Sequence, residues 1–492
     1  MERSALVLSG LSSRRLRDGA VRAYNQGSVP RRNSDSRRNP MAKKRQAPNG
    51  KRWLERYAPM TDRANHIART LAEKGFQALF AGGCVRDMVM NRPPDDIDIA
   101  TDARPEDVGA LFPKTVPVGV SFGVMKVILE KQDFEVTTFR TEGPYLDGRR
   151  PSAVRYASAQ EDAQRRDFTV NGMFYDPLKG EIIDFVEGRA DIKRRVIRTI
   201  GDPLKRFDED KLRLLRAIRF AGKLGFKIEL QTWDALCKLA PTVAQTSWER
   251  IRDEILKILL DKNRRRGFEL MRDSGLLKEV LPDVANMIGV EQPEGFHPEG
   301  DVFTHTMLML EKMEDPTPTL ALGVLFHDIG KPATFAVRDR IRFDNHCKVG
   351  AEMAGRVCKR LRCPRRMIQQ VEHLVSEHMR FKDVQKMRDS TLKRFLRSDN
   401  FDELLELYRL DCVASHGDLE AWEFCKRKLN ELAAEEIRPK PVLCGKDLIR
   451  MGYRPGPAFS EILRAVEDAQ LDGIVSTRGE AEQLVREKFP LS

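Results

Sequence analysis

The apolar pattern of the chain changes once, near Gly201, and this change limits the folds that the chain can adopt. From Tyr57 to Gly201, short apolar runs alternate with helical segments, which predicts a mixed α/β domain. From Pro203 onward the apolar residues recur with helical spacing, as in Asp210–Leu224 and Trp248–Leu260. We therefore expect an α/β domain followed by a long all-α part.

The expected elements can be placed along both parts. The α/β part opens with a helix at Thr61–Lys74, and its β-like runs are Gln77–Ala81, Ile97–Ala100, Gly123–Glu130, Phe134–Arg140 and Ile182–Phe185. Helical periodicity continues over Asp301–Leu432, where prolines interrupt it. It is found again over Leu443–Phe489.

Composition excludes several classes of protein. The chain has 492 residues, of which 41% are hydrophobic and 33% charged, which is enough for several folded domains. No apolar stretch approaches the roughly eighteen residues of a membrane span, and the run at Leu320–Phe326 is far shorter. Eight cysteines without a CxxC pair argue against a disulfide scaffold or a zinc ribbon. We expect a large cytosolic protein with no membrane contact.

The first fifty residues are basic and have no periodic apolar pattern. Their twelve lysines and arginines face three acidic residues, so they carry most of the net charge of +12, and the rest of the chain is nearly balanced. We expect a disordered extension at residues 1–50. It could attract RNA, serve as a targeting segment, or lie upstream of a true start at Met41. The lack of a long apolar stretch argues against a secretory signal.

A glycine-rich turn and a pair of aspartates follow the first expected strand. Gly82 and Gly83 lie where that strand gives way to a helix, so the backbone can approach a ligand there and its N–H groups can bind an anion. Asp96 and Asp98 are two residues apart on the next expected strand, so their carboxylates share one face. Two carboxylates so close repel each other unless a cation lies between them. This is the arrangement of a two-metal phosphoryl-transfer site.

Together with two later motifs, these residues resemble the class II tRNA nucleotidyltransferases, the CCA-adding enzymes, and the related bacterial poly(A) polymerases. The motifs are Gly82-Gly83-x-Val85-Arg86-Asp87, Asp96-x-Asp98, Arg165-Arg166-Asp167-Phe168-Thr169-Val170-Asn171 and Glu209-Asp210-x-x-Arg213. The resemblance covers residues 57–492. It implies a head with the DNA polymerase β-like nucleotidyltransferase fold, followed by an all-α neck, an HD body and a helical tail.

The resemblance also implies roles for single residues. Asp96 and Asp98 would hold two Mg²⁺ ions that activate the 3′-hydroxyl of RNA and neutralise the triphosphate. Glu135 is the candidate third catalytic carboxylate, although an ordinary strand-surface glutamate is an equal alternative. The residues expected to bind the nucleotide are Gly82, Gly83, Arg86, Arg165, Arg166, Asp167, Asn171, Asp210, Arg213 and Arg216.

Asp210 and Arg213 are the expected selectors of the base. At a spacing of three on a helix they share a face, which also fits a plain ion pair. A carboxylate only accepts hydrogen bonds and a guanidinium only donates them. Cytosine and adenine each present an amino donor beside a ring-nitrogen acceptor, whereas guanine and uracil present the opposite order. One Asp–Arg pair can therefore accept CTP and ATP and refuse GTP and UTP.

The subfamily is indicated by a loop. Residues Tyr145–Pro151 resemble the flexible loop of complete CCA-adding and A-adding enzymes, which CC-adding enzymes lack. The glycine–arginine–arginine signature of bacterial poly(A) polymerases is not evident in Ser121–Thr137, and the pair Arg149-Arg150 belongs to the loop. We favour addition of CCA to tRNA with CTP and ATP. A poly(A) polymerase or an A-adding enzyme is the nearest alternative.

Seven of the eight histidines lie between His297 and His416. The order His305, His327-Asp328, Asp411 is similar to that of HD-superfamily phosphohydrolases, and such ligands suit a divalent transition metal. Three further histidines, His346, His373 and His378, could extend the site to a second metal, bind phosphate, or be polar surface residues. The resemblance implies a metal-dependent phosphohydrolase acting on phosphomonoesters or cyclic phosphates, although HD domains also persist as structural modules.

The expected domains are a head at 57–201, a neck with the nucleotide-selecting motif at 202–281, an HD domain at 282–432 and a tRNA-binding tail at 433–492. In a rival hypothesis the HD phosphohydrolase is the main activity and the head only holds RNA. A non-catalytic RNA-binding protein is disfavoured because every carboxylate and metal ligand that the family motifs require is present.

Overall fold

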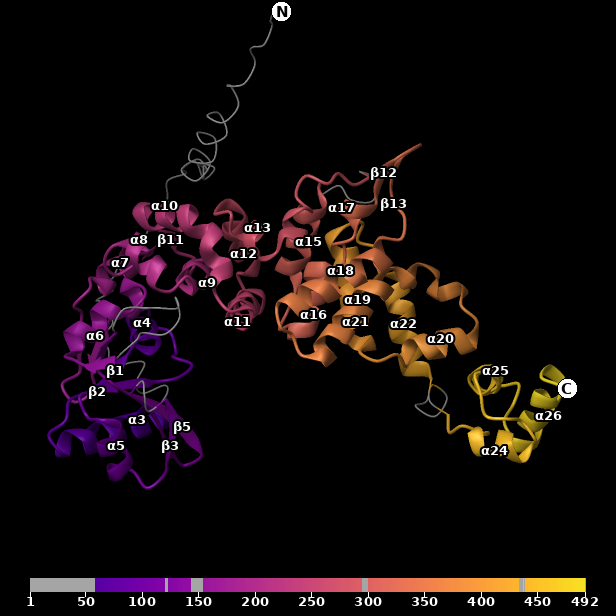
Figure 1. Cartoon of the computed structure of the whole chain (residues 1–492), viewed down its shortest axis with the longest axis horizontal. Helices are drawn as coiled ribbons and strands as arrows, with labels where there is room; N and C mark the ends of the chain where they lie inside the picture. The colour runs from indigo at the N-terminus through magenta and orange to yellow at the C-terminus, as the bar shows by residue number, and fades with distance from the viewer. Residues whose placement is uncertain are drawn as a thin grey trace, which may run out of the picture.

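The structure is a computed structural model that describes residues 58–119, 123–142, 154–293, 300–432, 437 and 439–491. The chain forms an elongated arc (Figure 1), with the sheet-containing head at one end, helices along the middle and three short helices at the other end. The basic extension expected at residues 1–50 and the loop at 145–151 lie outside the described residues.

The head is built on one seven-stranded sheet. Its order is β3-β4-β5-β2-β1-β8-β9, and β2 and β5 are parallel while the other neighbours are antiparallel. The strands are β1 (Ala78–Ala81), β2 (Asp98–Thr101), β3 (Thr115–Gly119), β4 (Val124–Leu129), β5 (Gln132–Thr138), β8 (Phe174–Asp176) and β9 (Glu181–Ile183). A separate ribbon pairs β6 (Arg140–Glu142) with β7 (Val154–Tyr156).

The two faces of the sheet carry different side chains because neighbours along a strand point to opposite faces. On one face Phe80, Ile99 and Val136 join the core formed with α3 (Ala58–Glu73), α4 (Gly83–Val89) and α5 (Pro105–Leu111). On the other face Leu79 and Ala100 pack with α6 (Ala159–Arg165). This second face also carries the site described below.

The middle of the molecule is helical, as predicted. The head ends with α7 (Gly188–Arg194). The helices that follow are α8 (Pro203–Glu209), α9 (Leu212–Leu224), α10 (Leu230–Leu239), α11 (Trp248–Leu259), α12 (Arg264–Asp273), α13 (Leu276–Val280) and α14 (Pro282–Ala285), which form the neck. The body contains α15 (Val302–Lys312), α16 (Pro318–Phe326), α17 (Lys331–Thr334), the hairpin β12 (Phe335–Val337) and β13 (Ile341–Phe343), α18 (His346–Arg360), α19 (Arg365–Glu377), α20 (Asp389–Leu396), α21 (Phe401–Ala414) and α22 (Glu420–Glu431).

Neck and body share one hydrophobic core, which includes Phe268 and Leu310. The buried Arg264 joins them as well, because its guanidinium donates to the carbonyls of Leu259 at 2.7 Å and of Met313 at 2.7 Å. The boundary expected at residue 281 therefore stays a prediction.

The tail has a small core of its own, formed by α24 (Gly445–Arg450), α25 (Ala458–Leu471) and α26 (Arg478–Lys488). It contacts the body mainly through α20 and α25. In the part of the chain that the structure describes, no helix has both the length and the apolar character to cross a membrane.

Two predicted elements begin later than expected, and both differences concern site residues. The second strand starts at Asp98, so Asp96 lies two residues before it rather than on it. The helix expected from Asp210 starts at Leu212, because Asp210 has an extended backbone and its carboxylate accepts the Leu212 N–H at 3.1 Å. The prediction that Asp210 and Arg213 share one helix is therefore wrong.

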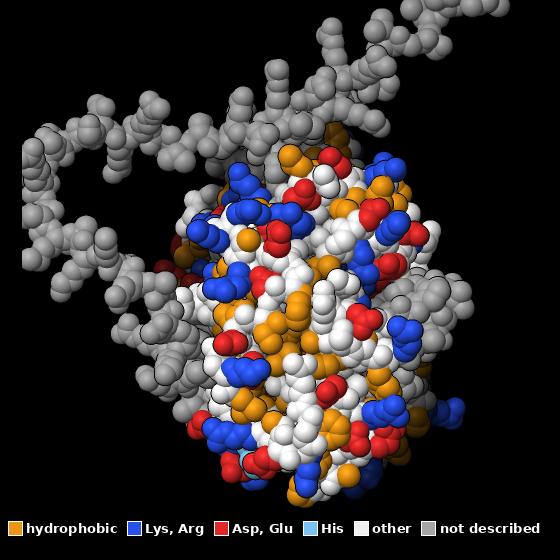
Figure 2. Space-filling view, turned by 90° about the vertical axis from the view of Figure 1, so that its left-hand side faces the viewer, with side chains coloured by type: hydrophobic (Ala, Val, Ile, Leu, Met, Phe, Trp, Pro, Cys, Tyr) orange, Lys and Arg blue, Asp and Glu red, His pale blue; other side chains and the backbone are white. Residues whose placement is uncertain are grey.

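The described surface is mixed in charge. Figure 2 looks onto the head end of the molecule and shows lysine and arginine side chains interspersed with acidic ones and with apolar patches. This agrees with the near balance of charge predicted for the chain beyond its first fifty residues.

Candidate nucleotide-binding and metal-binding sites

A cavity of about 750 Å³ lies in the head against α9. It gathers Asp96, Asp98 and all the residues predicted to bind a nucleotide, namely Gly82, Gly83, Arg86, Arg165, Arg166, Asp167, Asn171, Asp210, Arg213 and Arg216. Nine lysines and arginines line it against six aspartates. Such a lining suits an anion as highly charged as a triphosphate, held together with cations.

Two of the carboxylates predicted to be catalytic, Asp98 and Glu135, lie on the site face of the sheet. Ile99 pairs with Val136, so the preceding residues Asp98 and Glu135 are neighbours on the opposite face. Burial and the charges of Asp96 and Glu135 raise the pKa of Asp98 to about 6, although Arg166 acts against them. This mutual repulsion is what bound divalent cations would relieve, so the residues fit a two-metal site.

A chain of hydrogen bonds ties the sequence motifs together. Arg86 donates to Asp87 at 2.9 Å and, through Nη1, to Asn171 Oδ1 at 2.8 Å. Asn171 Nδ2 donates to Asp167 at 3.2 Å, and Arg216 Nε on α9 donates to the same carboxylate at 2.8 Å. Burial raises the pKa of Asp167, but Arg216 outweighs it and holds that pKa below its usual range. The head and the neck are therefore locked together at the site.

Asp162 is a site residue that the sequence reasoning missed. It is 1% exposed and accepts from Arg165 Nε at 2.9 Å and from Arg166 Nη2 at 3.0 Å. Burial raises its pKa, but the two guanidiniums prevail and lower it. Asp162 also accepts the Arg140 N–H at 3.3 Å. It fixes Arg165 and Arg166, which both line the cavity. Its spacing of three and four residues from them on α6 was the available signal.

Of the two glycines in the turn, Gly82 is the one at which a larger residue would be strained. Its φ is +76°, and a Cβ there would lie 3.1 Å from Arg166 Nη1. At Gly83 a Cβ would make only an ordinary contact, 3.7 Å from Arg86. The first glycine therefore lets the guanidinium of Arg166 approach the turn.

Asp210 and Arg213 both line the cavity, but each is anchored separately. Arg250 Nη2 donates to Asp210 Oδ2 at 2.8 Å, and Arg213 Nη1 donates to Glu209 Oε2 at 2.8 Å. In the described chain, Asp210 pairs with Arg250 and Arg213 pairs with Glu209, instead of the Asp210–Arg213 ion pair considered as an alternative. Arg250 on α11 was not predicted, because nothing in its local sequence distinguishes it from a surface arginine.

The predicted HD residues come together in the body. Ligand atoms of His305, His327 and Asp411 lie within 4.8 Å of one another, and His305 Nε2 is 3.1 Å from Asp411 Oδ1. Asp328 lies 3.0 Å from His327 Nε2 and 2.7 Å from Lys331 Nζ. Although burial alone would raise the pKa of Asp328, His327 and Lys331 hold it well below its usual range.

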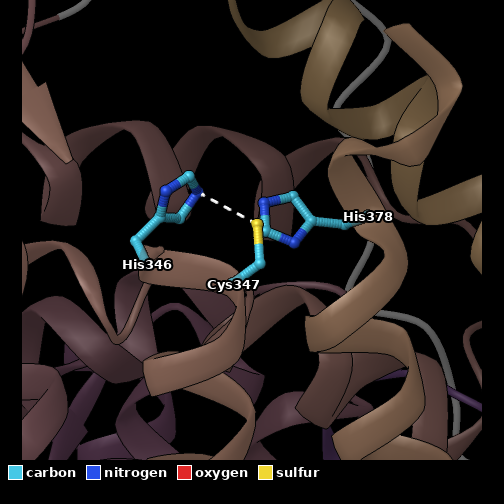
Figure 3. Close-up of side chains that lie close together, drawn as sticks. All are labelled: His346, Cys347 and His378. Carbon is cyan, nitrogen blue, oxygen red and sulfur yellow. Dashed lines mark hydrogen bonds between the residues drawn. The ribbon is translucent and has the colours of Figure 1, made fainter. Parts of the chain in front are cut away.

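Two more of the predicted histidines join this centre. His346 and His378 come from the start of α18 and the end of α19, and Figure 3 shows them around Cys347, whose Sγ lies 3.5 Å from His346 Nε2. His378 Nε2 lies 3.9 Å from Asp328. His373 does not join, because it lines a separate hollow with Glu372 and Glu377.

The protonation of these rings fits metal binding. Nδ1 of His327, His346 and His378 lies 2.7 to 2.8 Å from a backbone carbonyl, which can only accept, so Nδ1 carries the proton. The Nε2 atom of each ring is therefore the one that can bind a metal, and that of His378 is buried without a hydrogen-bond partner in the described chain. Metal-binding histidines are oriented in this way.

The head has the nucleotidyltransferase fold, with its cavity on the site face of the sheet. Three segments match known domain families: residues 78–198 match "Poly A polymerase head domain", 225–288 match "Probable RNA and SrmB- binding site of polymerase A", and 301–410 match "HD domain". The chain therefore carries the head domain and the RNA-binding segment of the poly(A) polymerase family, followed by an HD domain. Domains of both kinds generally use divalent metals.

Similar proteins include two CCA-adding enzymes. That of Bacillus licheniformis is 47% identical over 215 residues, which are 44% of this chain and 54% of the relative. That of Geobacillus stearothermophilus is 44% identical over 228 residues, 46% of this chain and 56% of the relative. The chain thus spans about half the length of the curated relatives it matches.

Solved structures resemble the chain over more of its length. The crystal structure of the Bacillus stearothermophilus CCA-adding enzyme in complex with CTP has a TM-score of 0.68 and 27% identity, and the match covers 87% of this chain and 98% of that one. A CCA-adding enzyme complex with ATP has a TM-score of 0.60 at 21% identity, covering 90% and 99%, which speaks for the fold alone.

Proposed function

We propose that the protein adds C, C and A to the 3′ end of tRNA in the cytoplasm, using CTP and ATP without a nucleic-acid template. The observation that carries the proposal is that one cavity is lined by the Asp96 and Asp98 carboxylates and by Asp210 and Arg213. A site for nucleotidyl transfer and a means of reading the base are thus combined. The names of the similar proteins support the same function.

In the proposed reaction the 3′-hydroxyl oxygen of the tRNA attacks the α-phosphorus of the nucleotide, pyrophosphate leaves and the hydroxyl proton is released. Asp96 and Asp98, with Glu135 as third carboxylate, would hold two Mg²⁺ ions. When bound, the ions make the hydroxyl a better nucleophile and neutralise the developing charge. Arg165 and Arg166 would bind the triphosphate, in the orientation that Asp162 gives them.

The base would be selected by hydrogen bonding. Asp210 keeps acceptor capacity beside its bond to Arg250, because a carboxylate has about four lone-pair sites. It would accept from the amino group of cytosine or adenine, while Arg213 donates to the ring nitrogen. Uracil and guanine would place donor against donor and acceptor against acceptor, so the cavity would reject them.

The histidine–aspartate centre supports a second activity, a phosphohydrolase with a divalent transition metal. Imidazole and carboxylate ligands suit Mn, Fe, Ni, Co or Zn. His305, His327, Asp328 and Asp411 would hold the metal, which would supply a water of lowered pKa as nucleophile. Lys331 lies 2.7 Å from Asp328 and would help to bind the substrate phosphate.

Two variants separate the activities and test the rival in which the head only holds RNA. Asp98→Asn should abolish extension of tRNA that lacks its CCA end, while metal-dependent hydrolysis of a phosphomonoester persists. His305→Ala should do the reverse. If Asp98→Asn still extends the tRNA, the head is not the transferase. If only ATP is incorporated, and into long tails, the protein is a poly(A) polymerase.

A further inference from the structure

A two-stranded hairpin projects from the body beside the histidine–aspartate centre (Figure 1). Its strands β12 and β13 pair Phe335 with Phe343 and Val337 with Ile341. In the described chain these two strands form a sheet of their own. An isolated ribbon of this kind is at best marginally stable in water unless something packs on it.

One face of the hairpin is apolar and open. The cross-strand partners Phe335, Phe343, Val337 and Ile341 share that face, and the two phenylalanine rings are 5.9 Å apart. Phe335 is 42% exposed and Val337 is 68% exposed. An uncovered apolar strip that includes an aromatic ring indicates a binding surface.

The same hairpin carries three arginines against one aspartate and forms a wall of the cavity over the centre. That cavity measures about 620 Å³ and is lined by Asp328, Asp411 and His346 together with Arg340, Arg342 and Lys382. Asp344 and Asp418 also line it, and Asp339 binds Arg342 at 2.9 Å. Lys331 Nζ lies 5.3 Å from the Phe343 ring. The cavity thus has four lining cations, Lys331, Arg340, Arg342 and Lys382, beside the apolar strip, and four lining aspartates.

Aromatic faces interleaved with arginines are the surface that single-stranded nucleic acids prefer, because bases stack on the rings and phosphates pair with the cations. An apolar protein segment would fit the strip but would leave Arg340 and Lys382 without a counterpart. The phosphate chemistry proposed for the adjacent centre favours the same choice.

We propose that the β12–β13 hairpin holds single-stranded RNA across the mouth of the HD cavity, so that the centre acts on RNA in preference to small phosphate esters. The preference for RNA substrates rests on the proposed phosphohydrolase activity. The binding of RNA to the hairpin does not depend on that activity. Phe335 and Arg340 are positioning residues in this scheme, since they touch the RNA beside the reacting phosphate.

Binding can be tested without activity. The full chain in EDTA is irradiated with a short 4-thiouridine oligonucleotide whose 3′-phosphate prevents its extension by the head, and crosslinked peptides are mapped by mass spectrometry. We expect a crosslink within residues 335–343 that Arg340→Glu removes, whereas crosslinks elsewhere remain. Crosslinks confined to the head and tail would overturn the proposal. The same result is expected if a copurifying protein, and not RNA, covers the hairpin.

Selectivity is tested by the KM of two substrates, the same oligonucleotide and p-nitrophenyl phosphate, with Mn²⁺. Phe335→Ala, at a residue that does not line the cavity, should raise the KM for the oligonucleotide at least about fivefold, as expected for a lost base stack, and leave the KM for the small ester unchanged. Equal KM values for wild type and variant would overturn the proposal, as would a wild type that hydrolyses only the small ester.

The control is Arg366→Glu, an exposed arginine near the start of α19. It precedes His378 by twelve residues, or about 18 Å of helix, and should change neither KM. If the wild type hydrolyses neither substrate with any divalent metal, the proposed phosphohydrolase fails, and the crosslink alone then decides whether the hairpin binds RNA.

Discussion

At the scale of single residues, several charged side chains of the head cavity are held in position by ion pairs with other charged side chains. Asp162 positions two arginines, and Arg250 anchors the aspartate expected to read the base. Such residues would not contact the reacting atoms. They would determine where the groups that contact the nucleotide lie. Their contribution can be measured apart from that of the catalytic carboxylates.

Asp162→Asn should weaken nucleotide binding and destabilise the head. Asparagine fills the same space but leaves Arg165 and Arg166 without their shared counter-charge, and breaking such a buried pair costs about 3 to 5 kcal/mol. We expect KM values for CTP and ATP about tenfold higher and a lower unfolding temperature. Asp133→Asn, which breaks an exposed pair with Lys126, is the control and should change both quantities little. An unchanged KM for Asp162→Asn would refute its positioning role.

Asp210→Asn should relax the choice of base. An amide can rotate to present a donor as well as an acceptor, so uracil and guanine would no longer be refused. Single-nucleotide incorporation with each of the four triphosphates measures the effect, and we expect UTP and GTP to rise relative to CTP and ATP. Asp208→Asn changes an exposed aspartate that binds Lys211 nearby, and should keep the wild-type preference. If Asp210→Asn keeps it too, Asp210 does not read the base.

At the scale of elements, the interiors of helices and strands follow from periodicity, and their ends do not. The helix at Ala58–Glu73, the strand at Val124–Leu129 and the helix at Trp248–Leu259 lie close to their predicted bounds. The helix starts at Leu212 rather than at Asp210 because the Asp210 carboxylate accepts the Leu212 N–H. The strand that starts at Asp98 is one residue shorter at its beginning than predicted. Site residues cluster at such ends, so their motifs were predictable while their geometry was not.

Gly82→Ala tests the turn that opens α4. The substitution adds the strain of a positive φ and a Cβ 3.1 Å from the Arg166 guanidinium. Gly75 offers a matched control, since its φ is +87° and a Cβ there would meet nothing within 4 Å. Both variants should lose about 1 to 2 kcal/mol of stability, whereas only Gly82→Ala should raise the KM for nucleotides. Equal nucleotide KM values in the two variants would contradict the role given to the approach of Arg166.

At the scale of the whole molecule, the tail is joined to the body by charge more than by apolar packing. Arg394 on α20 donates to Glu467 on α25 at 2.6 Å, and Arg397 binds the same carboxylate, while the tail keeps a separate core. We infer that the tail can detach as a unit when these ion pairs weaken. The histidine–aspartate centre, by contrast, lies within the shared core of neck and body.

Docking of the tail should depend on salt and on pH. Burial raises the pKa of Glu467, but Arg397 and Arg394 outweigh it and hold that pKa below its usual value. Because the folded pKa is the lower one, the stabilisation is present above about pH 4.5, the usual value, and is lost as the pH falls through the folded pKa. Hydrogen exchange of α20 and α25 should increase in that range, and at high salt. Glu467→Gln should show the same increase at neutral pH; slow exchange in this variant would contradict an ionic latch.

The central claim is that one cavity in the head both transfers nucleotides and chooses them. The most direct measurement is to incubate tRNA lacking its last three nucleotides with all four triphosphates and Mg²⁺, and to sequence the 3′ ends. We expect products that end in CCA and grow no further, and none after Asp98→Asn. Tails of A alone, or ends containing U and G in proportion to their supply, would contradict the central claim.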